Sequence, residues 1–249
     1  MQRSLYRGAC GMKGLAATIE ALESPVEVFF RDDDAGWADP ELHALLDLFE
    51  DRGLPIDLAV IPAALGKVSA RNLASRRECH GGIGLHQHGY AHLNYEPEER
   101  RKCEFGPSRP ATSQIADVIA GRERLASLLE VIDPIFTPPW NRCSDELVDA
   151  LGEHGFALFS ADRSRRSRET PTAQLPVTFD WERHRREERL EAGLVEQFAK
   201  ADGPIGIMLH HEAMDDAARA ELGGALDVIA ASSAISVRPM RHWIAKGRP

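Results

Sequence analysis

The sequence predicts an α/β fold organised as a single distorted (β/α) barrel of seven or eight mostly parallel strands, spanning residues 1–249. Short apolar runs alternate with amphipathic stretches along the whole chain, which favours strands joined by helices and hence a parallel sheet. This many strands in 249 residues favours a barrel over a doubly wound sheet, the other arrangement with the same alternation. Polar residues also gather where the predicted strands end.

Each predicted element follows from a local pattern. β-Branched and aromatic residues mark the strands, as in VEVFF at 26–30. Apolar residues at helical spacing mark the helices, and Ser144 followed by acidic residues predicts a helix start. The predicted strands are 26–30, 55–62, 81–86, 134–139, 156–160, 175–181, 204–210 and 234–240, and the predicted helices lie near 40–53, 63–77, 111–130, 143–155, 186–200 and 215–230. The irregular stretches 88–108 and 161–185 are long enough to be functional loops.

Composition and charge favour a cytoplasmic globular protein that does not bind nucleic acid. The 43% hydrophobic content suffices for a sizeable core, and a formal net charge of −9 argues against the basic face that phosphate backbones require. We interpret the one basic cluster, RSRRSR at 163–168, as a solvated loop, with contact to a substrate phosphate as the minor alternative. The start of the chain has no apolar signal segment, and no apolar run is long enough to span a membrane. The four cysteines, Cys10, Cys79, Cys103 and Cys143, form no C-x-x-C pair and are interpreted as reduced thiols.

Five polar stretches coincide with strand ends: FFRDDD, GIGLHQHGYAH, FTPPWN, VTFDW and GIMLHHE. In a barrel these ends converge on one mouth, where barrel active sites lie. The first stretch carries three consecutive carboxylates, Asp32, Asp33 and Asp34, which repel one another. Helix capping does not account for them, because Asp39-Pro40 already supplies a cap and a first-turn proline. We therefore expect one carboxylate to bind a metal ion and a neighbour to act as a base.

The second stretch offers metal ligands. His88 and His92 have the spacing H-x-x-x-H, which on one helical turn places both imidazoles on the same face. Two imidazoles and one carboxylate make an open site for a divalent ion, with positions left for water and substrate. His86 ends the predicted strand, and for it a ligand role and an ordinary buried histidine are equally good interpretations.

The remaining strand ends supply candidate substrate and proton-transfer residues. Two prolines make TPPWN a rigid turn, and the indole of Trp140 offers a flat wall of the kind that stacks on a sugar. A packed tryptophan in an ordinary turn is the alternative. Asp180 and the pair His210 and His211 end two later strands; one of the two histidines is expected to face the mouth as a general acid, while the other points away.

In order along the chain, these stretches resemble the motifs of the polysaccharide deacetylase family, also known as the NodB-homology fold. FRDDDAG is similar to the first motif, with Asp33 in the place of the catalytic base and Asp34 in the place of a metal ligand; a shift by one, to Asp32 and Asp33, is the alternative. HGYAH matches H-[ST]-x-x-H, with Gly89 where the family has Ser or Thr. TPPWN resembles the third motif, and IMLHH resembles the last, most naturally at His210.

The resemblance implies a metal-dependent hydrolase that removes an acyl group, in the first place acetyl, from an N-acylated sugar. Its metal would be Zn²⁺ or another divalent ion such as Co, Ni or Mn, bound by Asp34, His88 and His92. Asp33 would be the base and His210 the acid. The partner would be a small-molecule or glycan substrate. Trp140, Arg142, Asp180, His211 and His86 are further candidates for the substrate side of the mouth.

One departure concerns the arginine that opens the third motif and orients the base, because Thr137 stands there; Arg31 or Arg142 is expected to replace it. Three alternatives stay open. A relative that hydrolyses a non-sugar amide differs only in substrate. An amidohydrolase using the H-x-H pair at 86–88 would place that pair after the first strand, whereas here it follows the third. A non-catalytic carbohydrate- or metabolite-binding barrel would bind its ligand without turnover.

Overall fold

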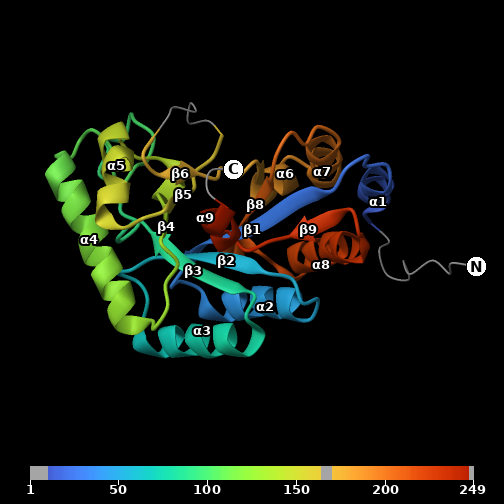
Figure 1. Ribbon diagram of the computed structural model, residues 1–249, viewed down its shortest axis with the longest axis horizontal. Helices are drawn as coiled ribbons and strands as arrows, with labels where there is room; N and C mark the ends of the chain where they lie inside the picture. The colour runs from blue at the N-terminus through green and yellow to red at the C-terminus, as the bar shows by residue number, and fades with distance from the viewer. Residues whose placement is uncertain (1–10, 164–169, 247–249) are drawn as a thin grey trace, which may run out of the picture.

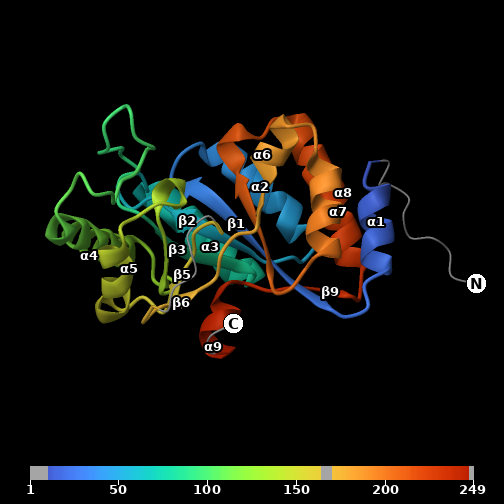
Figure 2. The same ribbon diagram turned by 90° about the horizontal axis from the view of Figure 1, so that it is seen from above.

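The computed structural model describes residues 11–163 and 170–246, so Cys10 and most of the basic cluster at 163–168 lie outside the described residues. Parallel strands form one curled sheet, around which the helices are arranged (Figures 1 and 2). The strands are β1 (Val26–Ala35), β2 (Ile56–Val60), β3 (Ile83–His88), β4 (Ile135–Thr137), β5 (Leu158–Phe159), β6 (Ala173–Gln174), β7 (Phe179–Asp180), β8 (Ile205–His210) and β9 (Ile235–Val237). The α-helices are α1 (Lys13–Glu20), α2 (Asp39–Glu50), α3 (Lys67–His80), α4 (Ala111–Leu128), α5 (Asp145–Ala150), α6 (Trp181–Arg186), α7 (Leu190–Ala199), α8 (Asp216–Ala231) and α9 (Arg241–Lys246).

The sheet has the strand order β6-β5-β4-β3-β2-β1-β8-β7, with β9 paired to β1, and its strand pairs are parallel. The order ends at β6 and β7, and among residues 11–163 and 170–246 no regular strand pair joins these two ends, so the curled sheet is an open, distorted barrel. This confirms the predicted fold class. Every predicted strand is present, and the two-residue strand β6 adds a ninth within the described part of the chain.

The structure differs from the predicted elements mainly in short helices. The sequence pattern does not predict helices α1, α6 and α9, because six to eight residues give too few turns for a clear apolar period. The predicted start of α5 is confirmed, since Ser144 Oγ accepts a hydrogen bond from the backbone N–H of Leu147. By contrast, the cap residue of α2 is Ala38, and Asp39 is already helical.

The two faces of the sheet bury different clusters. Val28 and Phe30 of β1 pack into the large core between the sheet and helices such as α2 and α8. Phe29, between them, belongs to a second cluster with Met208, Met240 and Trp243. Since successive side chains of a strand point to opposite faces, this second cluster fills the inside of the curl.

Helix α9 covers one end of the interior. The rings of Phe29 and Trp243 lie 5.5 Å apart, edge to face. The backbone N–H of Met240 donates a 2.8 Å hydrogen bond to the buried carboxylate of Asp57 on β2. Figure 2 shows α9 on the opposite side of the molecule from the loop between β3 and α4. The described helices include none with the length and apolar character needed to cross a membrane.

Candidate metal centre

The candidate site lies inside the curl at the carboxyl ends of β1, β3 and β8. Strand alternation decides which residues face it. Leu85 of β3 and Leu209 of β8 pack into the outer core, so His88 and His210, each an odd number of residues away, are directed to the inside. Asp33 shares the inner face with Phe29 for the same reason. The predicted convergence of these strand ends is therefore present.

Asp34, His88 and His92 form a cluster whose possible ligand atoms all lie within 4.8 Å of one another. The Nε2 atoms of His88 and His92 lie 3.2 Å and 3.1 Å from Oδ1 of Asp34. This oxygen is buried and makes no hydrogen bond within the described residues. Ligand bonds of about 2.0–2.1 Å in a tetrahedral site place neighbouring ligand atoms about 3.3–3.4 Å apart. The cluster therefore fits a divalent ion held by two imidazoles and one carboxylate.

The protonation of His88 is arranged for a ligand role. Its Nδ1 lies 3.1 Å from the backbone carbonyl oxygen of Thr137, an acceptor only, so Nδ1 carries the hydrogen and donates it. In the neutral ring this leaves the Nε2 lone pair directed at Asp34. Burial raises the pKa of Asp34, but the imidazoles of His88 and His92 outweigh burial and hold that pKa well below its usual value. The carboxylate is thus ionised over the whole physiological range.

Strained backbone shapes this cluster. Asp34 and His92 have left-handed conformations with φ of 73° and 56°, and Trp140 and Asn141 of the adjacent turn have φ of 55° and 57°. Each such non-glycine residue costs of order 1–3 kcal/mol. The expectation that His88 and His92 lie on one helical turn is wrong. His88 is still part of strand β3, where it pairs with Thr137 of β4, and a non-helical turn then brings His92 back.

Arg31 holds the carboxylate of Asp33 in a two-point ion pair. Its Nε and Nη2 atoms each donate a 2.8 Å hydrogen bond, one to each carboxylate oxygen. Ser160 and Asn141 accept further hydrogen bonds from the same guanidinium, at 2.9 Å and 2.7 Å. Burial raises the pKa of Asp33, but Arg31, with His88 and His210, outweighs burial and lowers it. Of the two arginines expected near the base, Arg31 therefore contacts Asp33, whereas Arg142 contacts the backbone oxygen of Lys102.

Asp32 points away from the mouth and binds His211. Its carboxylate lies 2.6 Å from Nδ1 of His211 and accepts the backbone N–H of the same residue at 2.9 Å. The Nε2 of His211 lies 3.0 Å from the backbone oxygen of Trp37. Burial lowers the pKa of His211, but Asp32 outweighs burial and raises it to about 9. His211 therefore ties β1 to the turn after it, which leaves His210 as the histidine on the inner face.

The other predicted residues lie around this centre in different roles. His86 is fully buried with Nε2 3.0 Å from the hydroxyl of Thr137, and burial, with Arg31 nearby, lowers its pKa to about 3. It is outside the Asp34 cluster, so of the H-x-H pair at 86–88 only His88 belongs to that cluster. Asp180 caps α6 by accepting the N–H of Arg183. The ring of Trp140 lies 4.3 Å from that of His92.

Sequence reasoning missed two residues at the mouth. Trp37, in the turn after β1, is 37% exposed and its ring lies 5.1 Å from that of His92, on which Trp140 also packs. Glu104, in the loop between β3 and α4, is fully buried and accepts the backbone N–H groups of Tyr90 and Ala91. Trp37 lies three residues after the run Asp32–Asp34, and this closeness is a sequence signal for a place at the mouth. Glu104 had no signal, since it lies twelve residues beyond the histidine motif in a polar stretch.

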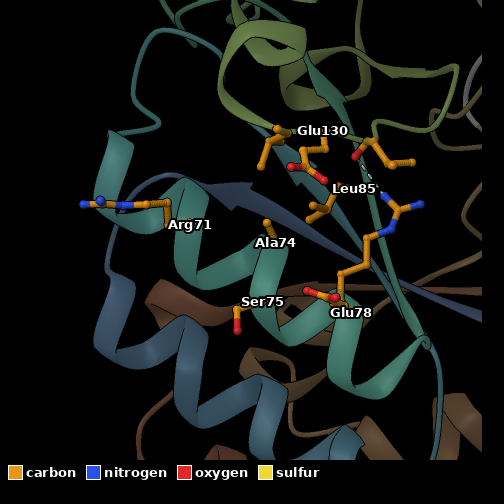
Figure 3. A pocket seen from close by; sticks show the side chains of 9 residues that line it. Arg71, Ala74, Ser75, Glu78, Leu85 and Glu130 are labelled. Atoms are coloured by element: carbon orange, nitrogen blue, oxygen red, sulfur yellow. Dashed lines mark hydrogen bonds between the residues drawn. The ribbon is translucent and has the colours of Figure 1, made fainter.

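A separate cavity of about 560 Å³ lies beside α3, between that helix and the segment 129–131 (Figure 3). Its wall mixes the charged residues Arg71, Glu78 and Glu130 with apolar side chains such as Leu85. None of its lining residues belongs to the Asp34 cluster. The cavity is therefore not part of the candidate metal centre.

No family model matches the sequence, and no curated protein matches it. Solved structures do match. A proposed polysaccharide deacetylase from Mycobacterium smegmatis has a TM-score of 0.65 and 14% identity over 91% of each chain. A family 4 acetyl xylan esterase from Clostridium thermocellum, in complex with a cobalt ion, has a TM-score of 0.59 and 14% identity over 90% of this chain and 93% of that chain.

A CE4 family pseudoenzyme from Bacillus anthracis has a TM-score of 0.61 and 12% identity, over 91% of this chain and 68% of that chain. At such identities the likeness is one of fold, and the same fold hosts a pseudoenzyme as well as an esterase. This chain has the fold of the polysaccharide deacetylases and family 4 carbohydrate esterases.

Proposed function

We propose that this protein is a metal-dependent hydrolase that removes an acyl group, in the first place acetyl, from an N-acylated sugar or sugar conjugate. The observation that carries the proposal is the cluster of Asp34, His88 and His92. Its ligand atoms all lie within 4.8 Å of one another, both imidazole Nε2 atoms lie close to Oδ1 of Asp34, and the Nδ1–H of His88 is committed to a backbone carbonyl. The fold supports the same class of reaction, and one neighbour of that fold was solved with a cobalt ion.

Asp34, His88 and His92 would hold the ion, with Zn²⁺ favoured and Co, Ni or Mn as the alternatives. A bound divalent ion lowers the pKa of water and polarises an acyl carbonyl. The orphaned Oδ1 of Asp34 and the lone pair on Nε2 of His88 are the donor atoms that such an ion needs. Three protein ligands leave positions open for water and substrate.

Asp33 is the proposed general base and His210 the proposed general acid. Arg31 fixes the carboxylate plane of Asp33 through both oxygens, so one of them takes the proton of the attacking water without first reorienting. The imidazole of His210 then gives a proton to the leaving amine nitrogen, which completes cleavage of the C–N bond. Both residues lie on the inner face of the curl, on the adjacent strands β1 and β8, and are register partners.

Two indoles support a sugar as the substrate. Trp37 and Trp140 both pack against the ring of His92, and Trp37 is 37% exposed. Flat aromatic surfaces of this kind stack on sugar rings. A non-sugar amide remains the alternative substrate, and a comparison of both substrate types with one enzyme preparation separates them.

A non-catalytic binding barrel remains the alternative from a different functional class, since the fold includes a pseudoenzyme. The absence of an arginine at Thr137 is the reason to consider it. Because Arg31 makes the two-point contact with Asp33 instead, that reason loses its force. Such a barrel would bind its ligand equally well after Asp33→Asn and would release no product.

The first experiment measures metal content by elemental analysis after purification without chelators and reloading with Zn²⁺ or Co²⁺. We expect about one ion per chain in the wild type, as in other open three-ligand sites, and its loss in Asp34→Ala, His88→Ala and His92→Ala. His80→Ala is the matched control, because His80 lies on α3 with a 45% exposed side chain and should leave metal content unchanged. A wild type that binds no divalent ion would refute the proposed mechanism.

The second experiment follows acetate release from N-acetylated sugar oligomers and small N-acetyl amides. Asp33→Asn should keep the metal and lose turnover by about 100-fold or more, as expected for removal of a general base. Full activity in this variant would exclude Asp33 as the base. If acetate were released from the small amides but not from the sugar oligomers, the substrate would be a non-sugar amide.

A further inference from the structure

A buried carboxylate outside the proposed ligands supports the turn between His88 and His92. Glu104 is 0% exposed. One of its oxygens, Oε1, accepts the backbone N–H of Ala91 at 2.7 Å, and the other, Oε2, accepts that of Tyr90 at 3.1 Å. These consecutive N–H groups lie between the two histidines. Without Glu104 they would be left unsatisfied beside the site, which is unfavourable for buried N–H groups.

Gly89 shows that the turn is built around this carboxylate. Its φ of +54° is left-handed, and a Cβ at this position would lie 2.2 Å from Oε2 of Glu104 and 2.5 Å from Cδ of Pro139. Residue 89 therefore has to be glycine for both steric and conformational reasons. Glu104 fills the space that a side chain at position 89 would need.

Glu104 itself is held rigidly. The ring of Phe105, the next residue, packs 5.7 Å from that of Phe136 in a buried cluster, and the backbone oxygen of Phe105 accepts the N–H of Ser144 at 2.7 Å. Arg109 donates to the backbone oxygen of Glu104 at 3.3 Å. The carboxylate thus acts as a fixed point for the turn rather than following it.

We propose that Glu104 is a positioning residue for the metal ligands, which holds the 89–91 turn in the conformation that directs His88 and His92 to Asp34. The inference rests on the proposed function, because it assigns a role toward the metal. The physical reason is the left-handed backbone at His92, which is strained for a non-glycine residue and persists only where surrounding contacts determine it. Two charge-assisted hydrogen bonds from one rigid carboxylate supply such contacts.

The test is Glu104→Gln in the full chain, with Co²⁺ affinity measured by competition against a chelator of known affinity. Glutamine keeps the shape but replaces one acceptor oxygen by an NH₂ group, so one of the two backbone hydrogen bonds is lost in either amide orientation. We expect Co²⁺ affinity to fall about 10–100-fold, the usual effect of removing an outer partner of a metal ligand. Glu104→Asp, which keeps the charge but is one methylene shorter, should bind with intermediate affinity.

Glu96→Gln is the matched control. Glu96 is also buried in the loop between β3 and α4 and also accepts a backbone N–H, that of Ser108 at 2.9 Å, but its carboxylate binds Ser108 and Arg100 rather than the 89–91 turn. We expect this variant to bind Co²⁺ like the wild type, even where its thermal stability falls. If both Gln variants lose affinity equally, or if Glu104→Gln and Glu104→Asp both bind like the wild type, Glu104 is not a positioning residue. A wild type that binds no ion would instead refute the proposed function, so the two failures are distinguishable.

Discussion

Asp57 on β2 makes the stability of this protein depend on pH in a direction opposite to that of most acidic residues. Its side chain is fully buried near the base of the barrel interior. Burial raises the pKa of Asp57 to about 7; the Met240 N–H opposes this effect, and the carboxylate of Asp133 adds to it. Arg241 and Arg77 also lower the pKa, by smaller amounts. The native protein therefore keeps a proton on Asp57 at pH values where the unfolded chain has lost it.

The magnitude follows from the difference between the ordinary pKa of 3.8 and the value of about 7 in the native protein. Because the native state binds more protons than the unfolded state in this interval, the free energy of unfolding falls as pH rises through it. Each pH unit between the two pKa values corresponds to about 1.4 kcal/mol, so the full contribution is about 4 kcal/mol. This stability is present below pH 3.8 and is lost as pH rises through about 7.

Asp57→Asn should abolish this dependence. An amide keeps an oxygen for the Met240 N–H and cannot ionise, so the variant should gain stability relative to the wild type by about 2–3 kcal/mol between pH 5 and pH 8. Urea unfolding followed by tryptophan fluorescence at several pH values measures the difference. Asp202→Asn, at a side chain that is 80% exposed, should parallel the wild type. Parallel curves for Asp57→Asn and the wild type would refute the reasoning.

Three other predictions concern the site and the fold. Arg31→Lys should lower kcat about 100-fold with little change in metal content, because lysine cannot hold both oxygens of Asp33; steady-state kinetics with an unchanged kcat would contradict this. Burial lowers the pKa of His88, but the carboxylates of Asp34 and Asp33 together outweigh burial and raise it. A proton on His88 therefore competes with the metal ion. Co²⁺ affinity should therefore rise about tenfold per pH unit to a point above pH 6.5, and an affinity that is flat from pH 5.5 to 7 would exclude this. Ser144→Ala should lower the free energy of unfolding by about 1 kcal/mol through loss of the α5 cap, as measured by urea unfolding. An unchanged unfolding midpoint would contradict this prediction.

The sequence predicts the sheet well because β-branched runs and helical spacing are local signals. Every strand longer than two residues is expected from the sequence, and so is the convergence of Asp34, His88 and His92. The pairing of Arg31 with Asp33 is also open to prediction, since residues two apart on a strand share a face. Sequence alone leaves this pairing undecided because Arg142 is a second arginine that could orient Asp33.

The direction of His210 and the role of Glu104 could not be predicted. Both sets of alternating residues in β8 are apolar, with Ile207 and Leu209 on one face and Met208 on the other, so the pattern does not show which face is inside. Asp34 lies within a register shift of β1, between Asp32 and Ala35, and has positive φ, and strand alternation gives no direction for such a residue. Glu104 acts across a loop without periodicity, where position depends on tertiary contacts alone.

The left-handed residues at the mouth have a consequence for engineering this protein. A laboratory selection for heat resistance would favour glycine at Asp34, His92 or Trp140, because glycine removes a steric cost of order 1–3 kcal/mol at such positions. Each of these gains would remove a proposed ligand or a wall of the site. Variants selected for thermal stability without a screen for activity would therefore tend to lose the proposed activity. Stabilising substitutions are better sought in distant helices such as α8.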